Sequence, residues 1–257
     1  MLEIRRLTKR FGGLTAVADI SFAVREGEIV GVFGPNGSGK TTLLNLIAGL
    51  AAPSAGAIFW RGADIAGFQA HEVAALGLVK TFQNPQLFAE LTALEHLLIA
   101  GHLALKRRLA WRRLVTLADA DYRGGSGALV ERAQEVLRLC RLDLAQATRG
   151  ADLSYGQEKM LGVAMGLMCE PRLLLLDEPA SGLGTAEIES LESVLRDLKG
   201  RGMTLCVIDH KVGFLRKLAD RAISLHHGAK IAEGLPDEVL RDPNVIAAYL
   251  GRADAAI

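Results

Sequence analysis

Hydrophobic and polar residues alternate with a period of two at the start of the chain. Leu2, Ile4 and Leu7 fall on one face of the first run, and residues 20–24 form a second run. This spacing predicts two strands, with a turn at Gly12–Gly13 between them and another at Glu26–Gly27 after the second.

Residues 28–33 form a short and almost entirely apolar run, Glu-Ile-Val-Gly-Val-Phe. A strand of this composition is typical of a sheet that is covered on both faces. A glycine-rich segment comes directly after it. Residues 41–50 then predict a helix that ends before Pro53, and residues 57–60 predict another strand.

The pattern changes between residues 89 and 170, where strands disappear and helical spacing takes over. One expected helical face carries Leu91, Leu94, Leu97 and Leu98, and another runs from residue 129 to residue 140. Between these faces lie a basic stretch over residues 106–113 and a glycine-rich stretch over residues 124–127. We expect the glycine-rich stretch to be flexible.

Strands and helices alternate again after residue 170. Alternation of this kind predicts parallel strands joined by crossover helices. The sequence therefore predicts an α/β core that is interrupted by a helical subdomain. The expected strands are residues 173–176, 203–208 and 222–225, and the expected helices are residues 186–198 and 212–219.

Composition limits the classes of function. The chain has 257 residues, 50% of them hydrophobic, a net charge of +1 and 5% aromatic residues. The balanced charge and few aromatics argue against a nucleic-acid partner. The three cysteines have neither metal nor redox spacing and are expected to be buried thiols. No signal peptide and no membrane-spanning run of about 18 apolar residues is expected.

The glycine-rich segment fits the pattern G-x-x-x-x-G-K-[ST] at every fixed position. Its backbone N–H groups and the positive end of the following helix would bind phosphate. Lys40 would neutralise the β- and γ-phosphates of ATP, and the Thr41 hydroxyl would ligate Mg²⁺. The segment consists of Gly34, Pro35, Asn36, Gly37, Ser38, Gly39, Lys40 and Thr41, and Thr42 follows it.

Two carboxylates follow the apolar run at residues 173–176. The C-terminal end of such a strand is where open α/β sheets bind ligands. Asp177 would hold Mg²⁺, and Glu178 would polarise an attacking water. The alternative is that both carboxylates cap the next helix.

A third motif, Leu-Ser-Tyr-Gly-Gln, covers residues 153–157. Locally it is a helix start, with Ser154 as the N-cap. A helix start is also an anion site, so a structural and a functional role are equally open here.

Together these motifs resemble those of the ATP-binding subunits of ABC transporters, over essentially the whole chain. Residues 34–41 look like the Walker A motif, and residues 173–178 look like Walker B with the catalytic glutamate. Residues 153–157 are similar to the signature motif, with Tyr155 in place of a glycine. The resemblance implies a single domain over residues 1–257 with a P-loop NTPase (RecA-like) parallel core and an N-terminal antiparallel β subdomain. The core would comprise residues 1–88 and 171–257, and residues 89–170 would form the helical subdomain.

The resemblance also assigns roles that the residues alone leave open. Phe11 would stack on adenine, although packing is the alternative. Gln83 would contact Mg²⁺ and water rather than being only a solvated loop residue. His210 would contact the γ-phosphate and orient Glu178 rather than being structural. The implied catalytic residues are Glu178, His210 and Lys40, the metal ligands are Thr41, Gln83 and Asp177, and the nucleotide contacts are Phe11, residues 34–42, Ser154, Tyr155, Gly156 and Gln157.

In this family two ATP-binding subunits meet head to tail, so the signature of one would contact the ATP of the other. The resemblance therefore implies a homodimer or heterodimer on the cytoplasmic face of the inner membrane. Transmembrane permease subunits would dock near Asn84, Pro85, Gln86, Leu87 and Phe88, although ordinary packing of the subdomain is the alternative. A solute-binding protein would be an indirect partner. The basic stretch would meet anionic lipid or an acidic partner, or would simply be solvated.

A closer similarity is to the ATPases of branched-chain amino acid importers and of related amide and urea importers. It is carried by residues 80–83, the basic stretch, Tyr155 and the ending at residues 242–251. The rivals are an ABC export ATPase for lipid or lipopolysaccharide and a non-transport ABC ATPase. Two positions depart from the family pattern, since Gly184 stands where aspartate is usual and Asp209 where glutamate is common.

Overall fold

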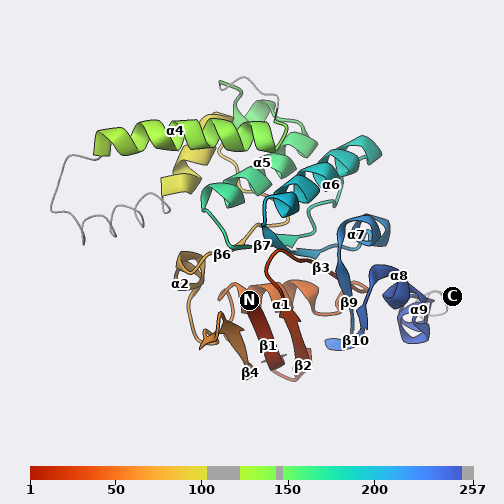
Figure 1. Ribbon diagram of the computed structural model, residues 1–257. Coiled ribbons are helices and arrows are strands. Elements are labelled where there is room, and N and C mark those ends of the chain that lie inside the picture. Colours follow the sequence, from red (N-terminus) through yellow and green to blue (C-terminus); the bar gives the residue numbers. More distant parts are fainter. Residues whose placement is uncertain (103–121, 143–146, 251–257) are drawn as a thin grey trace.

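The computed structural model describes residues 1–102, 122–142 and 147–250, whose strands form two sheets (Figure 1). The first sheet is antiparallel in the order β2-β1-β4-β5. The second has the order β10-β9-β3-β8-β7-β6. The first contains β1 (Leu2–Phe11), β2 (Leu14–Val24), β4 (Ala55–Trp60) and β5 (Ala63–Asp64). The second contains β3 (Ile29–Phe33), β6 (Leu78–Lys80), β7 (Leu173–Asp177), β8 (Thr204–Ile208), β9 (Arg221–His226) and β10 (Ala229–Gly234).

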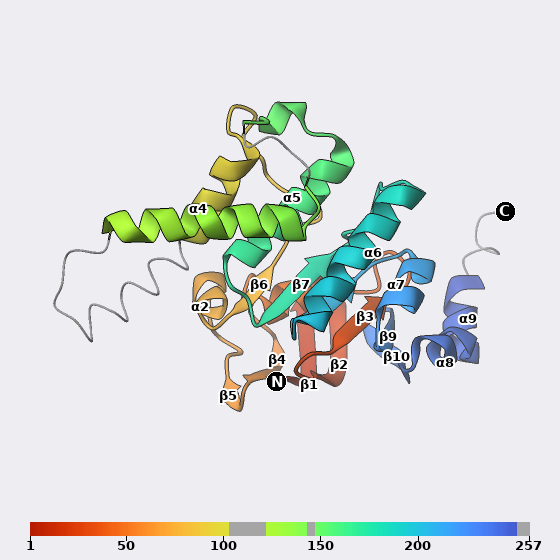
Figure 2. The same cartoon turned by 45° about the horizontal axis from the view of Figure 1, so that its top comes forward.

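Helices flank the six-stranded sheet, and α1 lies between the two sheets (Figures 1 and 2). The helical region sits on the other side of the six-stranded sheet, where α5 lies between α4 and the sheet. The helices are α1 (Lys40–Ile47), α2 (Ala70–Ala75), residues 93–102, α4 (Tyr122–Leu139), a 3-10 turn at Gly150–Asp152, α5 (Tyr155–Met168), α6 (Thr185–Gly200), α7 (Val212–Leu218), α8 (Pro236–Arg241) and α9 (Pro243–Leu250).

The expected parallel core is confirmed. β3 pairs in parallel with β8 and β9, and β7 pairs in parallel with β6 and β8. Each residue of β3 is buried. Val30 and Val32 face the core that includes the antiparallel sheet, whereas Ile29 and Phe33 face the helices. The sheet is therefore covered on both sides, as the apolar run predicts.

The helical face from residue 129 to residue 140 is also confirmed in α4. Ala133, Val136 and Cys140 are fully buried and share one core with α5. Cys140, Cys169 and Cys206 are free thiols, and burial raises the pKa of Cys140 and of Cys206 to about 12. The two buried thiols therefore remain protonated at neutral pH.

Two expectations for the helical region are wrong. Leu91 lies before the helix at residues 93–102 and does not share its face, because the chain first bends back to bond with the 3-10 turn: the Leu91 carbonyl accepts from Gly150 N at 2.8 Å. Residues 124–127 belong to α4 instead of forming a flexible link. The packed face further along α4 offsets the helix cost of each glycine, about 1 kcal/mol relative to alanine. The basic stretch at residues 106–113 lies outside the described residues.

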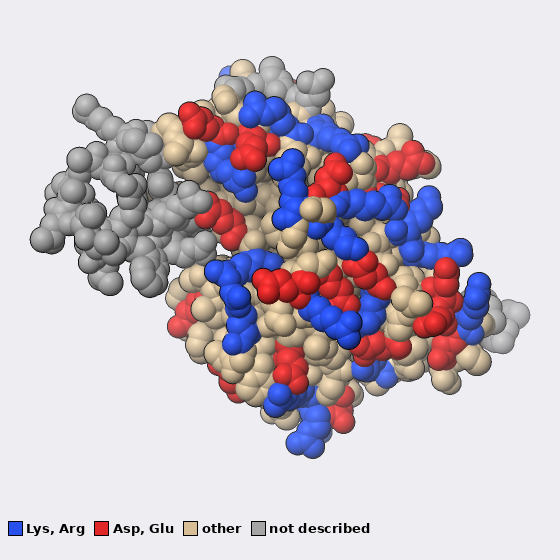
Figure 3. Space-filling model, in the orientation of Figure 1, with Lys and Arg blue, Asp and Glu red and all other residues tan. Residues whose placement is uncertain are grey.

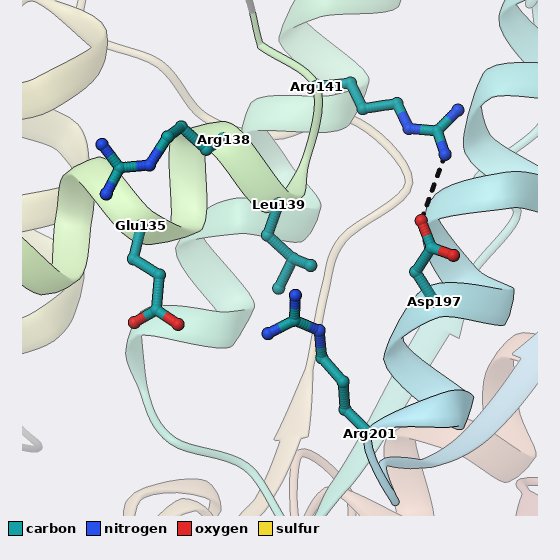
Figure 4. Close-up of a pocket in the computed structure, with 6 residues that line it drawn as sticks. All are labelled: Glu135, Arg138, Leu139, Arg141, Asp197 and Arg201. Atoms are coloured by element: carbon teal, nitrogen blue, oxygen red, sulfur yellow. Dashed lines mark hydrogen bonds and ion pairs between the residues drawn. The ribbon is translucent and has the colours of Figure 1, made fainter.

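The helical region meets the core where α4 ends beside α6 (Figure 4). Arg141 follows α4 and donates to Ser193 and Asp197 of α6, at 2.6 Å and 3.1 Å. A hollow of about 290 Å³ lies at this junction, lined by Glu135, Arg138, Leu139, Arg141, Asp197 and Arg201. The ion pair between Arg141 and Asp197 is half exposed, so it contributes at most about 1 kcal/mol to the free energy of unfolding.

Candidate functional site

The glycine-rich segment forms a loop between β3 and α1, as the sequence predicts. At Gly39 φ is 98°, and a β-carbon there would lie 2.3 Å from the Ala16 carbonyl oxygen. Only glycine fits this close approach. Inside the loop the Lys40 ammonium donates to the carbonyl oxygens of Gly34 and Pro35, at 2.8 Å and 3.0 Å. The Ser38 hydroxyl is buried there and has no hydrogen-bond partner among the described residues. The loop thus concentrates polar groups that suit a phosphate.

A cleft of about 490 Å³ opens beside this loop. It brings together predicted residues from three distant parts of the chain: Phe11, the loop and Glu178. Sequence reasoning missed four residues of its wall, which carry no motif. The wall consists of Phe11, Leu14, Thr15, Ala16, Asn36, Gly37, Gly39, Lys40, Thr41, Thr42, Glu178 and His227.

Phe11 ends β1 at the mouth of the cleft, and 52% of its surface is exposed. The Lys9 ammonium lies 5.0 Å from the centre of its ring. An aromatic ring with one open face beside a phosphate-binding loop suits a base that stacks on it. The exposure argues against the alternative role in packing, and adenine binding stays a prediction.

Phe11→Ala is expected to weaken ATP binding about tenfold, because base–aromatic stacking contributes about 1–3 kcal/mol. Affinity for inorganic tripolyphosphate, which has no base, should be unchanged. Isothermal titration with both ligands measures this difference. The control is Phe68→Ala, since Phe68 is also an exposed phenylalanine but does not line the cleft. Equal losses for both ligands would contradict stacking.

Asp177 ends β7 and is nearly buried between two other side chains. Its carboxylate lies 3.0 Å from the Lys80 ammonium and 3.4 Å from the Thr41 hydroxyl. Lys80 balances the buried charge and holds the carboxylate beside the loop. Sequence reasoning missed this function of Lys80. The hydroxyl, the carboxylate and the Gln83 amide are the hard oxygen donors that Mg²⁺ prefers, so these residues fit the ion.

Glu178 directly follows β7 with a φ of 48°, a conformation that is uncommon outside glycine. Its carboxylate accepts from Gln83 Nε2 at 2.9 Å and lies 3.6 Å from His210 Nδ1. β7 and β8 are neighbours, which places His210 beside Glu178 as the sequence predicts. A strained residue that carries two polar partners at the edge of a cleft is typical of a catalytic position.

The signature motif begins α5 with the expected cap. The Ser154 hydroxyl accepts from Gln157 N at 3.3 Å, and Ser154 N donates to Gln157 Oε1 at 2.9 Å. Tyr155 donates its hydroxyl to the Ser181 carbonyl at 3.3 Å. Ser154 and Tyr155 are exposed, and none of residues 154–157 lines the cleft beside the loop. The structure therefore does not bring this predicted anion site to the phosphate loop of its own chain.

Residues 84–88 run over the surface between the core and the helical region. Phe88 is 63% exposed, although its backbone N–H donates to His96 Nε2 at 2.9 Å. His96 is itself buried and contacts the Thr92 carbonyl. The buried His96 thus holds the backbone of the segment in place, while the apolar ring of Phe88 is exposed to solvent.

The side of the molecule in Figure 3 shows lysine and arginine interspersed with aspartate and glutamate. This face carries no large field of one sign, in keeping with the net charge of +1. Among the described residues, no helix has both the length and the apolar character to cross a bilayer.

The C-terminal helix α9 packs behind the phosphate loop, and the sequence did not predict this contact. The ring centres of Tyr249 and Phe33 are 6.4 Å apart. Burial raises the pKa of the Tyr249 phenol, despite a hydrogen bond with the Gly34 backbone. Helix α9 therefore packs against the end of β3, the strand that leads into the loop.

Comparison with protein families gives two matches. The sequence model described as "ABC transporter" matches residues 17–181. A second, described as "Branched-chain amino acid ATP-binding cassette transporter", matches residues 229–255. The two matches cover the phosphate loop, the signature and Walker B motifs, and the C-terminal segment.

Two curated relatives cover nearly the whole chain. The high-affinity branched-chain amino acid transport ATP-binding protein BraF of Pseudomonas aeruginosa is 37% identical over 98% of each chain. The lipopolysaccharide export system ATP-binding protein LptB of Acidithiobacillus ferridurans is 32% identical over 98% of this chain and 97% of its own.

Solved structures agree with the fold. An ATP-binding cassette of an ABC transporter in its ADP conformation has a TM-score of 0.83 at 29% identity, and 98% of each chain is covered. A dimeric cassette in a post-hydrolysis state, bound to ADP and phosphate, has a TM-score of 0.76 at 25% identity. That match covers 92% of this chain and 99% of the cassette.

Proposed function

The chain belongs to the ABC transporter family and is an ATP-binding cassette, and from this premise we propose that it drives an importer of branched-chain amino acids. The observation that carries the ATPase part of the proposal is the convergence of Lys40, Thr41 and Glu178 on one cleft, with Asp177 beside Thr41. The C-terminal family match and the names of relatives such as BraF favour import of branched-chain amino acids.

The predicted site residues have distinct parts in ATP hydrolysis. The loop and Lys40 hold the phosphates, and Phe11 holds the base. Glu178 accepts a proton from the attacking water, while Gln83 and His210 fix its carboxylate. A Mg²⁺ ion held by Thr41, Gln83 and Asp177 would neutralise charge on the phosphates. The contribution of the protein is therefore mainly positioning and electrostatic stabilisation.

The working unit in this proposal is a head-to-tail dimer. The exposed start of α5 lies outside the cleft of its own chain, so it is available to the ATP of a second subunit. Its capped N-terminus offers backbone N–H groups to a phosphate. The dimeric relative bound to ADP and phosphate supports such an assembly. The partner is a second copy or a second ATP-binding subunit.

Permease subunits would dock on residues 84–88, at the cytoplasmic face of the membrane. The exposed Phe88 ring and the fixed backbone beneath it support this site. Residues 1–88 with 171–257 would act as the nucleotide-binding core, and residues 89–170 would move with the signature. ATP binding would close the dimer, and hydrolysis would reopen it.

Purification of the tagged chain from solubilised membranes tests this function. We expect it to recover transmembrane subunits that, in ATP-loaded proteoliposomes, take up leucine, isoleucine and valine. Phe88→Ser should lower the recovery of these subunits, whereas the control Phe68→Ser should not. Recovery without any transmembrane subunit would contradict the proposal.

The second candidate is an export ATPase, which the similarity to LptB favours. It would use the same cleft, so only the identity of the membrane subunits and of the transported molecule separates the two. Recovered subunits that extract lipopolysaccharide or lipid and take up no amino acid would support export.

A further inference from the structure

Lys159 is a buried cation one turn into the signature helix α5. Only 7% of its surface is exposed, and its ammonium donates a hydrogen bond to the backbone carbonyl of Gln83. The same ammonium lies 5.3 Å from the centre of the Tyr155 ring. Within the part of the chain that the structure describes, no carboxylate forms an ion pair with it. A carbonyl and an aromatic face therefore compensate its charge.

Burying a charge without an opposite charge costs free energy, and an apolar residue would fill the same space at lower cost. The carbonyl that Lys159 holds belongs to Gln83, whose side chain donates to Glu178 at 2.9 Å. A lysine at this position therefore fixes the backbone from which the Gln83 amide reaches the predicted general base.

A second contact lies on the same face of α5. A β-carbon at Gly162 would be 3.0 Å from the Pro85 side chain, so helix and loop are in close contact there as well. Positions 159 and 162 are three residues apart and share a face of the helix. The first half of α5 and residues 83–85 are thus in contact at two points and can move as one body.

We propose that Lys159 is a positioning residue. It couples the position of the signature helix to the position of Gln83, and Gln83 in turn positions Glu178 of the same chain. This inference rests on the proposed dimer, in which Ser154 and Tyr155 contact the ATP of the partner. Closure on that ATP moves α5, and Lys159 carries the movement to the chain's own catalytic carboxylate. Each site is then competent only when the other is occupied.

Lys159→Met tests the proposal, because methionine keeps a long unbranched side chain but removes the charge and the donor. We expect kcat for ATP to fall roughly 10-fold, since catalytic groups displaced by a fraction of an ångström lose rate steeply. The KM for ATP should stay within about twofold, and the Hill coefficient for ATP should fall towards one. Lys159→Arg, which keeps a charged donor, should recover most of kcat. The control is Lys217→Met on α7, an exposed lysine that belongs to none of the motifs and does not line the cleft, and it should behave as wild type.

A double-mutant cycle with Gln83→Ala separates positioning from general damage to the fold. If Lys159 acts through the Gln83 side chain, Lys159→Met should lower kcat no further in the Gln83→Ala background. Full additivity of the two effects, or wild-type kcat and Hill coefficient in Lys159→Met, would overturn the inference. Failure of the wild-type chain itself to hydrolyse ATP would instead contradict the proposed function.

Discussion

Replacing Glu178 with glutamine is expected to lower kcat for ATP hydrolysis roughly 100-fold or more, because a positioned general base contributes about 10²–10⁴ in rate. Glutamine has nearly the same shape and keeps an oxygen that can accept from Gln83, but it does not take the proton of the attacking water. The φ of 48° at this position also fits glutamine as well as glutamate. The site should therefore remain assembled while chemistry stops.

ATP affinity should change little, since Glu178 lies at the edge of the cleft and is not part of the loop that holds the phosphates. In the proposed cycle, binding closes the dimer and hydrolysis reopens it, so Glu178→Gln should accumulate an ATP-bound dimer. Steady-state hydrolysis, ATP titration and size-exclusion chromatography with MgATP measure the three quantities.

Glu189→Gln is the matched control, because Glu189 is an exposed glutamate on α6 outside the cleft. It should hydrolyse ATP at the wild-type rate. Wild-type turnover in Glu178→Gln would contradict the general-base role of Glu178. The strained backbone at this position would then have no catalytic explanation.

The family matches cover the phosphate loop, the signature and Walker B motifs, and the C-terminal segment. BraF and LptB are each similar to nearly the whole chain, and their names give branched-chain amino acid transport for BraF and lipopolysaccharide export for LptB. An exporter would use the same cleft as an importer, so the cleft does not distinguish the two. Direction must therefore depend on the permease that residues 84–88 would contact.

Most of the fold could be predicted because its strands have strong local patterns. β3, β7 and β8 are short apolar runs, and each is buried on both faces as such runs require. The missed elements have weak or mixed patterns. β10 (Ala229–Gly234) has no fully buried residue, and β6 (Leu78–Lys80) has only three residues, so pairing with neighbouring strands rather than local preference creates them.

The candidate site was predictable where a motif fixes the spacing along the chain. The loop and Glu178 fall in one cleft because β3 and β7 end at the same edge of a parallel sheet. Lys80, Lys159 and His227 were missed as site residues because their roles arise only from tertiary contacts. In the sequence, neither Lys80 nor Lys159 can be distinguished from an ordinary surface lysine. Only the fold places Asp177 beside Lys80 and the Gln83 carbonyl beside Lys159.

Replacing Lys40 with alanine is expected to weaken nucleotide binding roughly 30-fold to 100-fold. A hydrogen bond to a charged group contributes about 1.5–3 kcal/mol, and each 1.4 kcal/mol is about tenfold in affinity. The Lys40 side chain is buried within the loop, where its ammonium donates to Gly34 and Pro35. Alanine removes both the charge that would meet the phosphates and the bonds that hold the loop in shape.

Thermal unfolding with and without MgATP measures this loss directly. A ligand present at about 100 times its Kd stabilises the native state by about 2.7 kcal/mol, so the wild-type chain should melt at a clearly higher temperature with nucleotide. Lys40→Ala should lose most of that increase at the same ATP concentration, whereas Lys217→Ala should keep it. The melting temperatures without nucleotide show whether the variant is folded. An increase equal to that of the wild type would mean that Lys40 does not meet the phosphates, and the assignment of residues 34–41 as the ATP-binding loop would then fall.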